Sequence, residues 1–414
     1  MIAILTLFNM LLEAVYILFF PVIYTILYLR NYLPSIFVSG SNTNKGILFH
    51  AASVGEVNAI KPLVTKLLTK HSDIKISITT STITGLQLAQ NISPLVKAHL
   101  SAIDIAHIRN KQLKIINPSL ICIVETEIWL NMLYYAKKHK IPVMFINARM
   151  SARTFVVYHK LKKLLRFVGK SIVGVYAQSE ENAQRYRQIF ECPVINSGNL
   201  KYSLKLKDYN TSDIRQDMGF NADDFILCWG SSRPGEEALI LSKLPALTKQ
   251  IPKLKLIIAL RHTNRLKDIV ALLQNVHYRL YSKGVSGENI NSQVLIIDTL
   301  GVLVKAYAIC DIAIVGGSFY DFGGHNPLEP AYFAKPIIIG NFYSSCKDSV
   351  KKLDEGNGIV ISDITKLEAD IISLAKDEAK RSSLGLQAKQ ILNDNSQALD
   401  EQMQAIVNVV EQII

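Results

Sequence analysis

Residues 311–336 read DIAIVGGSFYDFGGHNPLEPAYFAKP, and this stretch decides how the second half of the chain folds. It opens with a short, β-branched strand, Ile312–Val315, which runs into a glycine pair and Ser318. A second glycine pair leads to Asn326, a favourable N-cap residue, and Glu329 follows in the first turn of an apolar helix. A strand, a glycine-rich loop and a helix in this order form one step of a parallel α/β sheet.

The junction between this strand and this helix is suited to a phosphate group. Gly316 and Gly317 let the backbone approach a ligand closely, and free N–H groups at the start of a helix attract anions. A carboxylate nearby, Glu329, could hold the hydroxyls of a ribose. The alternative is a glycine-rich turn with a capping box from Asn326 to Glu329 and no ligand. Two glycine pairs with His, Asn and Glu at one junction favour the ligand site.

The run GGSF…GGHNPLEPA…KP closely resembles the nucleotide-binding signature of the Kdo transferases. These enzymes are inverting glycosyltransferases of the two-domain GT-B fold. They move 3-deoxy-manno-octulosonic acid (Kdo) from CMP-Kdo to a lipid A precursor in lipopolysaccharide biosynthesis. The resemblance extends from about Lys45 to the C-terminal helix, and it implies a CMP site in which the glycine loop supplies amides to the phosphate. The residues that it implies in this site are Gly316, Gly317, Ser318, Asn326 and Glu329.

The composition limits the class of protein. The chain has 414 residues, which is too long for one ordinary core, so two domains are expected. Its formal net charge of +12 implies an anionic partner or surface. The basic residues are dispersed and no helix-turn-helix, zinc-finger or RNP pattern occurs, so we expect membrane lipids as that partner and no nucleic acid. No metal site and no cofactor is expected, because the five cysteines are scattered and no D-x-D or His/Cys cluster occurs.

The N-terminal segment Met1–Leu29 is almost wholly apolar, has Glu13 as its charged residue, and is long enough to span a bilayer. It lacks the basic n-region and the small-residue cleavage site of a signal peptide. We therefore expect a membrane anchor at residues 1–33, which either spans the bilayer or lies in its surface as a hairpin broken near Pro21. Arg30 follows directly, and the positive-inside rule places the rest of the chain on the cytoplasmic face of the inner membrane.

Short apolar strands alternate with amphipathic helices in both halves of the chain, which indicates parallel sheets covered on both faces. The expected fold is α/β and GT-B-like, with two doubly wound Rossmann-like domains that face an interdomain cleft. The expected strands are Gly46–Ala51, Ile74–Ile78, Leu120–Val124, Val143–Ile146, Val173–Ala177, Phe225–Trp229, Leu254–Ala259, Val294–Ile297, Ile312–Val315 and Ile337–Ile339. The expected division is the anchor at 1–33, an acceptor-binding domain at 34–205, a linker at 206–222, a CMP-sugar-binding domain at 223–395 and a C-terminal helix at 396–414.

The run HAASVGE ends the first expected strand. Ser53 and Glu56 have capping-box spacing, so one interpretation is that Glu56 only caps the following helix. The Kdo transferases have the same S-V-G-E segment, and its glutamate is their proposed general base. The resemblance implies that Glu56 takes a proton from the acceptor hydroxyl, with its pKa raised by desolvation, and that Ser53 and Gly55 contact the acceptor.

Two carboxylates, Glu125 and Glu127, follow the buried strand at Leu120–Val124. The family motif is E-T-E-I-W followed by Pro, and Leu130 stands in place of that Pro. The resemblance implies that Glu127 belongs to the catalytic group, where it positions the acceptor or the sugar, and that Glu125 contacts the acceptor.

Two basic residues are suited to the carboxylate of the donor sugar. Arg149 lies in N-A-R-M-S, which matches the N-A-R-L-S of the family, and a guanidinium can clamp a carboxylate through two nitrogens. The alternative for Arg149 is a surface ion pair. Lys201 lies in G-N-L-K, as in the family, and could face the same anion.

Two further motifs in the second half follow strands. GSSRPGE joins a glycine and two hydroxyls to a Pro-led helix start, so Ser231 is expected at a phosphate. The family usually has G-S-T-H here, and the role of Arg233 in place of His is open. Arg261 and His262 match the P-R-H of the family without its Pro, and Arg261 is a candidate for the CMP phosphate, with His262 beside it.

Three alternatives to a Kdo transferase share this architecture. A GT-B lipid glycosyltransferase that uses a UDP-sugar should lack S-V-G-E and N-P-L-E-P in this form. A nucleotide-sugar epimerase needs no membrane anchor. A non-catalytic binding protein on the same scaffold should have lost Glu56, which this chain retains. The resemblance therefore favours the Kdo transferase.

Overall fold

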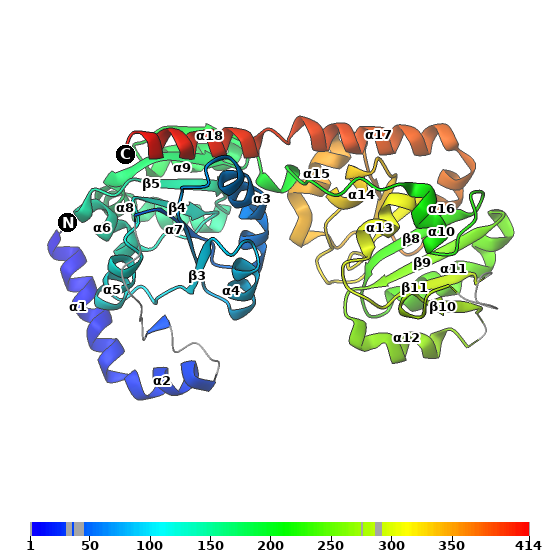
Figure 1. Cartoon of the computed structure of the whole chain (residues 1–414), viewed down its shortest axis with the longest axis horizontal. Helices are drawn as coiled ribbons and strands as arrows, with labels where there is room; N and C mark the ends of the chain where they lie inside the picture. Colours follow the sequence, from blue (N-terminus) through cyan, green and yellow to red (C-terminus); the bar gives the residue numbers. More distant parts are fainter. Residues whose placement is uncertain (1, 30–34, 37–44, 275, 286–291, 414) are drawn as a thin grey trace. The chain divides into compact units, whose positions relative to one another are not determined.

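The computed structural model of the chain describes residues 2–29, 35–36, 45–274, 276–285 and 292–413. The chain divides into two compact units (Figure 1). Unit 1 comprises Met1–Ser203 and Asn395–Ile414, and unit 2 comprises Leu204–Asp394. Residues 30–34 and 37–44, which include Arg30 and part of the expected anchor, lie outside the described residues.

Unit 1 contains a parallel sheet whose described strands have the order β3-β2-β1-β4-β5-β6-β7. The strands are β1 (Ile47–His50), β2 (Ile76–Thr80), β3 (Val96–Leu100), β4 (Leu120–Val124), β5 (Val143–Ala148), β6 (Ile172–Ala177) and β7 (Val194–Asn196). The helices around it are α3 (Val54–Lys70), α4 (Ile83–Gln90), α5 (Ala106–Ile116), α6 (Leu130–His139), α7 (Ala152–Lys160), α8 (Lys162–Val168), α9 (Glu180–Ile189) and α18 (Ala398–Glu411).

Unit 2 repeats this plan, with a parallel sheet in the order β10-β11-β9-β8-β12-β13-β14. The strands are β8 (Phe225–Ser232), β9 (Leu254–Leu260), β10 (Tyr278–Leu280), β11 (Val294–Ile297), β12 (Ile312–Val315), β13 (Ile337–Ile339) and β14 (Val360–Ile361). The helices are α10 (Thr211–Asp217), α11 (Glu236–Gln250), α12 (Leu266–Leu272), α13 (Leu303–Ile309), α14 (Leu328–Tyr332), α15 (Lys347–Glu355), α16 (Leu367–Lys376) and α17 (Glu378–Asp394).

Two doubly wound parallel α/β units confirm the expected fold class. The central strands β4 and β12 are buried along their whole length, as their continuous apolar sequences predict. Four strands were not expected: β3, β7, β10 and β14. Each of them lies at an edge of its sheet and exposes part of its side chains, so it carries no continuous apolar run.

The segment expected as a linker, 206–222, is structured and belongs to unit 2. It contains α10, and its side chains Ile214, Met218 and Phe220 are buried in the core of that unit. Three apolar residues are too few to produce a helical period that can be recognised in the sequence. They are nevertheless enough to anchor the segment to the core of unit 2. The C-terminal helix α18 packs on α3 of unit 1, with Met403 and Ile406 among its buried residues.

In each sheet the strand order reverses next to the first strand of the unit, and ligands of doubly wound folds bind at the carboxyl ends of such strands. In unit 1 this point lies between β1 and β4, and in unit 2 it lies between β8 and β12. Most of the expected site motifs follow these strands or their neighbours β5 and β9, and the G-N-L-K motif follows β7. The topology therefore brings the motifs of each unit to one edge of its sheet.

The apolar N-terminal segment forms α1 (Ile2–Leu18) and α2 (Phe20–Leu29), which expose large apolar side chains along most of their length. Leu5 is buried against unit 1, and the carboxylate of Glu13 lies 2.7 Å from Nδ1 of His107 on α5. Among the described residues no helix alone has the length and apolarity to cross a membrane. The two helices meet that requirement as a pair, bent by 70° between them.

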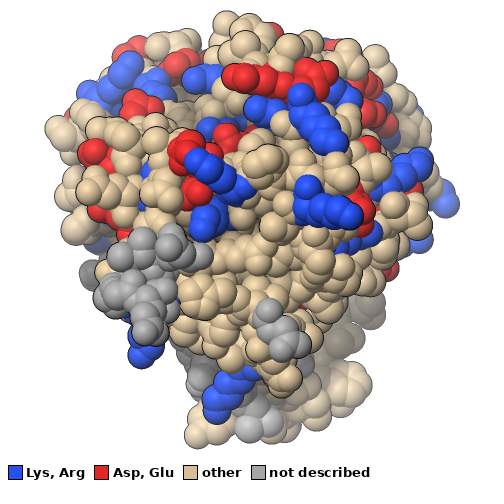
Figure 2. Space-filling model, turned by 90° about the vertical axis from the view of Figure 1, so that its right-hand side faces the viewer, with Lys and Arg blue, Asp and Glu red and all other residues tan. Residues whose placement is uncertain are grey.

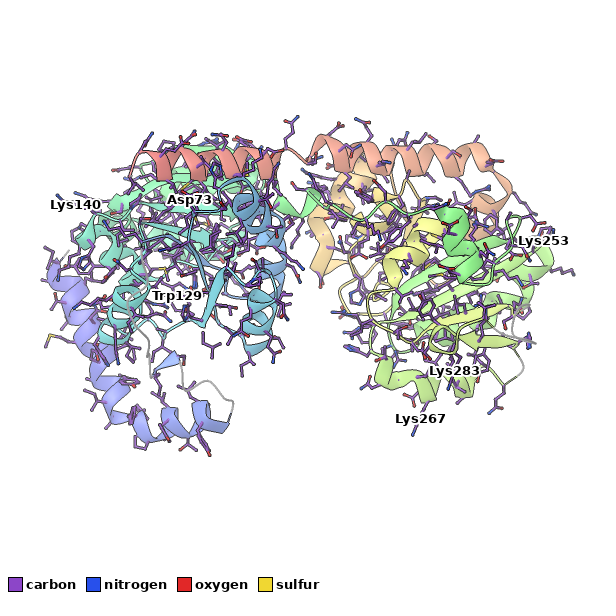
Figure 3. The ribbon with its side chains drawn as sticks, viewed as in Figure 1. Asp73, Trp129, Lys140, Lys253, Lys267 and Lys283 are labelled. Atoms are coloured by element: carbon purple, nitrogen blue, oxygen red, sulfur yellow. The ribbon has the colours of Figure 1, made fainter. Side chains whose placement is uncertain are left out.

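The charged side chains on one face of the molecule are of both signs. On the face shown in Figure 2, Lys and Arg side chains are interspersed with Asp and Glu. Lys253, Lys267 and Lys283 of unit 2 are drawn at separate places on its surface (Figure 3). This pattern agrees with basic residues that are dispersed along the sequence.

Candidate active site

Glu56 lies in the first turn of α3, directly after β1. Its carboxylate accepts hydrogen bonds from the amide of Ala52 (2.7 Å) and from Oγ of Ser53 (2.9 Å). Oγ of Ser53 in turn accepts from the amide of Glu56 at 3.3 Å. The capping interaction expected as the alternative for Glu56 is thus present, with Ala52 as the amide that the carboxylate reaches.

Glu56 can have a chemical role in addition to capping, because its carboxyl group is also desolvated. Burial raises its pKa from 4.5 to about 7, and the negative charges of Glu125 and Glu127 contribute in the same direction. The bonds from Ala52 and Ser53 oppose this rise. A carboxyl group with a pKa near 7 is suited to general base catalysis at neutral pH.

A buried group of polar and aromatic side chains supports the loop after β4. His50 is fully buried; its Nδ1 lies 3.0 Å from Oγ1 of Thr79, and its Nε2 accepts from Nε1 of Trp129 at 2.9 Å. Burial and the nearby charge of Arg109 lower the pKa of His50 to about 3, so its ring is neutral. Burial raises the pKa of Glu127, while a bond from Trp129 and the charge of Arg109 oppose this. Figure 3 labels Trp129 within unit 1.

Arg149 lies beside the same loop. It follows β5, and its carbonyl oxygen accepts from Oγ1 of Thr126 at 2.6 Å. Its guanidinium is exposed and forms no ion pair with the described residues, so the expected alternative of a surface ion pair is not observed there. Lys201, in the short helix Leu200–Tyr202, is exposed too, and its amide donates to Oδ1 of Asn199.

Unit 2 brings several basic side chains together at the carboxyl ends of β8, β9 and β12. Nη1 of Arg233 lies 2.5 Å from Nε2 of His262, and the Arg233 guanidinium lies 4.8 Å from the ring centroid of Phe322. Burial lowers the pKa of His325 to about 4, and the charges of Arg261, Arg233 and His262 act in the same direction. Nε of Arg233 and Nε2 of His325 are buried without a hydrogen-bond partner in the described part of the chain. Such a group of donors is suited to an anion.

The two residues expected at the ribose, Asn326 and Glu329, lie next to these cations. Oδ1 of Asn326 accepts from the amide of Leu328, where α14 begins. Burial raises the pKa of Glu329, whereas a hydrogen bond from Asn326 and the charge of Arg261 oppose the rise. Asn326, Glu329 and Arg261 are therefore close enough to act on one ligand.

The expectation that the glycine loop supplies amides to a phosphate is wrong. The amides of Gly317, Ser318 and Phe319 donate to the carboxylate of Glu236 at 2.8, 3.0 and 3.1 Å. The amide of Gly316 donates to a backbone carbonyl of β8. Glu236 is fully buried and fills the position that a bound anion would need.

The glycines in this loop are required for close packing. Gly317 has a φ of +71°, and a Cβ atom there would lie 2.9 Å from the ring of His325. A Cβ atom at Gly316 would lie 2.6 Å from the backbone oxygen of Ser231, which itself has a φ of +56°. The loop therefore packs closely against His325 and the end of β8.

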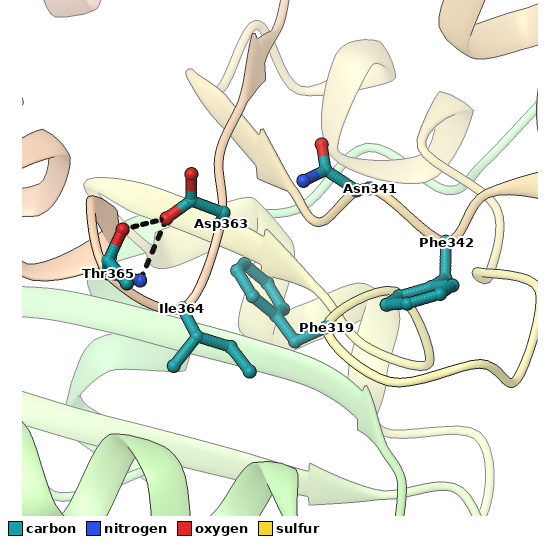
Figure 4. Close-up of a pocket in the computed structure, with 6 residues that line it drawn as sticks. All are labelled: Phe319, Asn341, Phe342, Asp363, Ile364 and Thr365. Atoms are coloured by element: carbon teal, nitrogen blue, oxygen red, sulfur yellow. Dashed lines mark hydrogen bonds between the residues drawn. The ribbon is translucent and has the colours of Figure 1, made fainter.

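A pocket of about 270 Å³ is lined in part by Phe319 of the same loop (Figure 4). Oδ1 of Asp363 accepts from the amide and the hydroxyl of Thr365 at 2.8 and 2.5 Å. The pocket therefore combines a fixed carboxylate with apolar walls. Its lining residues are Phe319, Asn341, Phe342, Asp363, Ile364 and Thr365.

No group of three or more His, Cys, Asp or Glu side chains in the described ranges is arranged to hold a metal ion.

Comparison with known proteins identifies the family. A family model described as 3-deoxy-D-manno-octulosonic-acid transferase (kdotransferase) matches residues 31–204, and a model of glycosyl transferases group 1 matches residues 214–391. The chain is 32% identical over 370 residues to the 3-deoxy-D-manno-octulosonic acid transferase of Haemophilus influenzae, which covers 86% of this chain and 85% of that protein. The chain belongs to the Kdo transferase family. A second such transferase, from Chlamydophila psittaci, is 30% identical over 74% of this chain and 71% of its own.

Solved structures agree with the fold. A UDP-GlcNAc 2-epimerase from Neisseria meningitidis aligns with a TM-score of 0.59 at 16% identity, over 89% of this chain and 100% of its own. A glycosyltransferase from Rickettsia africae aligns with a TM-score of 0.57 at 13% identity, over 89% and 99%. At such identities these likenesses show the fold alone, which is that of two parallel-sheet α/β domains of the GT-B kind.

Several site residues of this Kdo transferase were not predicted. His50, Trp129 and His325 lie inside the quoted motifs, so their position next to assigned residues was the available signal. Arg233 was noted only as a departure from the family pattern. Glu236 ends the quoted GSSRPGE motif, but its partners lie more than 80 positions away in the sequence, so its contact with the glycine loop was not predicted.

Proposed function

We propose that this Kdo transferase moves Kdo from CMP-Kdo to a lipid A precursor with inversion, and that Glu56 is its general base. The observation that carries the proposal is the desolvated carboxyl group of Glu56, whose pKa is raised to about 7 at the carboxyl end of β1. Glu125 and Glu127 are near enough to influence that pKa, so three carboxyl groups serve one region of unit 1.

The reaction follows from these assignments. The Glu56 carboxylate takes the proton of the acceptor hydroxyl as its oxygen bonds to the anomeric carbon of Kdo. The bond from that carbon to the phosphate oxygen breaks, and CMP leaves with the electron pair. Attack from the face opposite CMP inverts the configuration. Glu127 stabilises the positive charge that develops on the sugar, and Ser53, Gly55 and Glu125 contact the acceptor.

The donor nucleotide binds to unit 2 through side chains. Arg261 and Arg233 pair with the phosphate, and a phosphate also suits the unpartnered Nε2 of His325, which burial keeps neutral at physiological pH. Glu329 and Asn326 hold the ribose hydroxyls. Ser231 and His262, at the ends of β8 and β9, complete the surroundings of the phosphate.

The sugar carries a carboxylate and several hydroxyls, which need different partners. Arg149 and Lys201 of unit 1 have exposed cationic groups suited to the carboxylate. The pocket beside the glycine loop is suited to the hydroxyls, because Asp363, Asn341 and Thr365 offer polar atoms within it (Figure 4). Asp363 would repel the sugar carboxylate, which therefore points away from this pocket.

Helices α1 and α2 attach the enzyme to the cytoplasmic face of the inner membrane, where its lipid acceptor resides. Their exposed apolar side chains support this, since an apolar surface of that size is unusual in a monomeric soluble protein. The net charge of +12 favours anionic lipid headgroups as further partners. The bend of 70° between α1 and α2 favours a pair of helices that lie in the membrane surface over a straight span.

The proposal is tested by Glu56→Gln. The variant should bind CMP as the wild type does, and its turnover should fall by about 100-fold or more, which is the usual contribution of a general base. Turnover near the wild-type rate would leave Glu56 as a cap only. Thermal-shift measurements with CMP, UMP and UDP should show stabilisation by CMP above the others, and stabilisation by UDP alone would favour a UDP-sugar enzyme.

A further inference from the structure

The C-terminal helix α18 carries a buried amide side chain, Gln402, which is fully inaccessible to solvent. Its Oε1 accepts a hydrogen bond from the amide of Asn147 at 2.9 Å. Its Nε2 donates to Oγ of Ser197 at 2.9 Å and to the carbonyl of Gly198 at 3.4 Å. One side chain therefore connects the end of β5 with the loop after β7.

The connection continues toward two of the proposed sugar-binding residues. Oδ1 of Asn147 accepts from the amide of Leu200 at 3.0 Å, and the carbonyl of Asn147 accepts from Nε2 of Gln178 at 2.9 Å. Oε1 of Gln178 accepts from Nδ2 of Asn199 at 3.1 Å. Oδ1 of Asn199 accepts from the amide of Lys201 at 3.0 Å. Asn147 and Asn199 each stand two residues before a proposed cation, Arg149 and Lys201.

The backbone at Asn147 depends on this support. Its φ is +49°, in the left-handed region, and the register between β5 and β6 shifts between Phe145 and Ala148. The shift takes the amide of Asn147 out of the strand ladder, and Gln402 supplies the acceptor that this amide needs. The direction in which Arg149 leaves the sheet is therefore set by a residue of α18.

We propose that Gln402 is a positioning residue for Kdo transfer, and that it acts by holding the turns that carry Arg149 and Lys201. This inference rests on the proposed role of these two cations at the sugar carboxylate. A glutamine is suited to the position because one end of its amide accepts and the other donates. Methionine has a similar volume, but it cannot donate a hydrogen bond and its sulfur accepts only weakly.

The location of Gln402 adds a second reason. The chain leaves unit 1 after Ser203 and returns at Asn395, and Oγ of Ser203 donates to the carbonyl of Ser396 at 2.7 Å. Both connections to unit 2 therefore begin within a few residues of the buried amides. The sugar-binding turns are complete only when the C-terminal helix is in place.

The test is Gln402→Met, with Gln404→Met as the matched control, because Gln404 lies on the same helix with an exposed side chain. We expect Gln402→Met to lower turnover by about 10- to 100-fold, since a misplacement of about 1 Å in a positioned group has effects of this size. Gln404→Met should transfer Kdo at the wild-type rate. CMP affinity should be unchanged in both, which also shows that unit 2 is folded.

A double-mutant cycle separates positioning from general stabilisation. In an Arg149→Ala background, Gln402→Met should lower turnover by no more than about twofold, because residues that act through one another are not additive. Equal fold-losses in both backgrounds, or wild-type turnover of Gln402→Met, would overturn the proposal.

Hydrogen exchange tests the same idea without turnover. Amides of 146–151 and 197–201 should exchange faster in Gln402→Met, while those of unit 2 should not change. Unchanged exchange in the two turns would also overturn the proposal. If Arg149→Ala alone transfers Kdo normally, the role of Arg149 fails, and the exchange result still decides whether Gln402 holds the turns.

Discussion

Replacing Ser53 with Ala should move the pH dependence of Kdo transfer to higher pH. Oγ of Ser53 donates to the Glu56 carboxylate at 2.9 Å and so stabilises its charged form, as does the amide of Ala52 at 2.7 Å. Burial raises the pKa of Glu56 and these two bonds oppose the rise; the balance is a pKa of about 7. Without the hydroxyl, burial is opposed by one donor only, so the pKa should rise further.

The size of the shift follows from the bond that is lost. A hydrogen bond to a charged group contributes about 1.5–3 kcal/mol, and one pKa unit corresponds to about 1.4 kcal/mol. Water that enters beside the side chain recovers part of this, so we expect a rise of about one unit, from about 7 to about 8. At pH 7 the deprotonated fraction of Glu56 would fall from about one half to about one tenth, and near pH 9 the variant would recover.

The assay is the initial rate of transfer from CMP-Kdo to a detergent-dispersed acceptor, measured from about pH 5.5 to 9 and expressed as kcat/KM. Ser53 also caps α3, so the control is Thr82→Ala, which removes the cap of α4 without removing a bond to Glu56. The reasoning is refuted if the midpoint of Ser53→Ala stays in place or moves to lower pH. It is refuted too if Thr82→Ala produces the same shift.

Four further predictions concern charge and attachment. Arg261→Ala should weaken CMP binding by about 10- to 150-fold in calorimetry, whereas Arg149→Ala should leave it nearly unchanged and depress transfer; equal losses of CMP affinity would contradict this division. Arg233→His removes the guanidinium above Phe322 and should weaken CMP binding by about tenfold, and full affinity would leave Arg233 without a role at the phosphate. Deletion of residues 1–30 should release the protein from washed membranes with some activity retained, and a membrane-bound product would indicate a second lipid-binding surface. Glu56→Gln should stabilise the protein at pH 8 by about 3 kcal/mol in denaturant unfolding, because a buried acid whose pKa is raised from 4.5 to about 7 destabilises the fold above pH 7. This gain should shrink at pH 5, and equal gains at both pH values would contradict the raised pKa.

The sequence predicts the interior of each sheet better than its edges, for a physical reason. β4 and β12 are covered on both faces, so every residue has to be apolar and the run is unmistakable. β3 and β10 lie at edges and keep polar residues on the solvent side, which leaves no period to detect. The helix α10 was missed for a related reason, since it is attached by a few apolar residues in an otherwise charged segment.

Within the site, the sequence predicted contacts between residues that are close in the chain. It did not predict contacts between residues that are far apart in the chain. The spacing of Ser53 and Glu56 predicted a local interaction, which the structure confirms. The amides of the glycine loop were predicted to bind a ligand. In the structure they donate hydrogen bonds to the carboxylate of Glu236, which lies at the start of α11. No local pattern could reveal that contact, because a carboxylate in the first turn of a helix ordinarily stabilises the N-terminus of its own helix.

Glu56 and the group of cations that includes Arg233 and Arg261 belong to different units of the chain, and this separation has a chemical reason. At the carboxyl ends of β1 and β4 stand the carboxyl groups of Glu56 and Glu127, and burial raises the pKa of both. At the ends of β8 and β9 stand Arg233 and Arg261, whose charges lower the pKa of His325. A guanidinium placed next to Glu56 would stabilise its charged form and lower its pKa, which would make it a weaker base. A phosphate-binding site needs guanidinium groups, so an enzyme that requires both is better served by one unit for each.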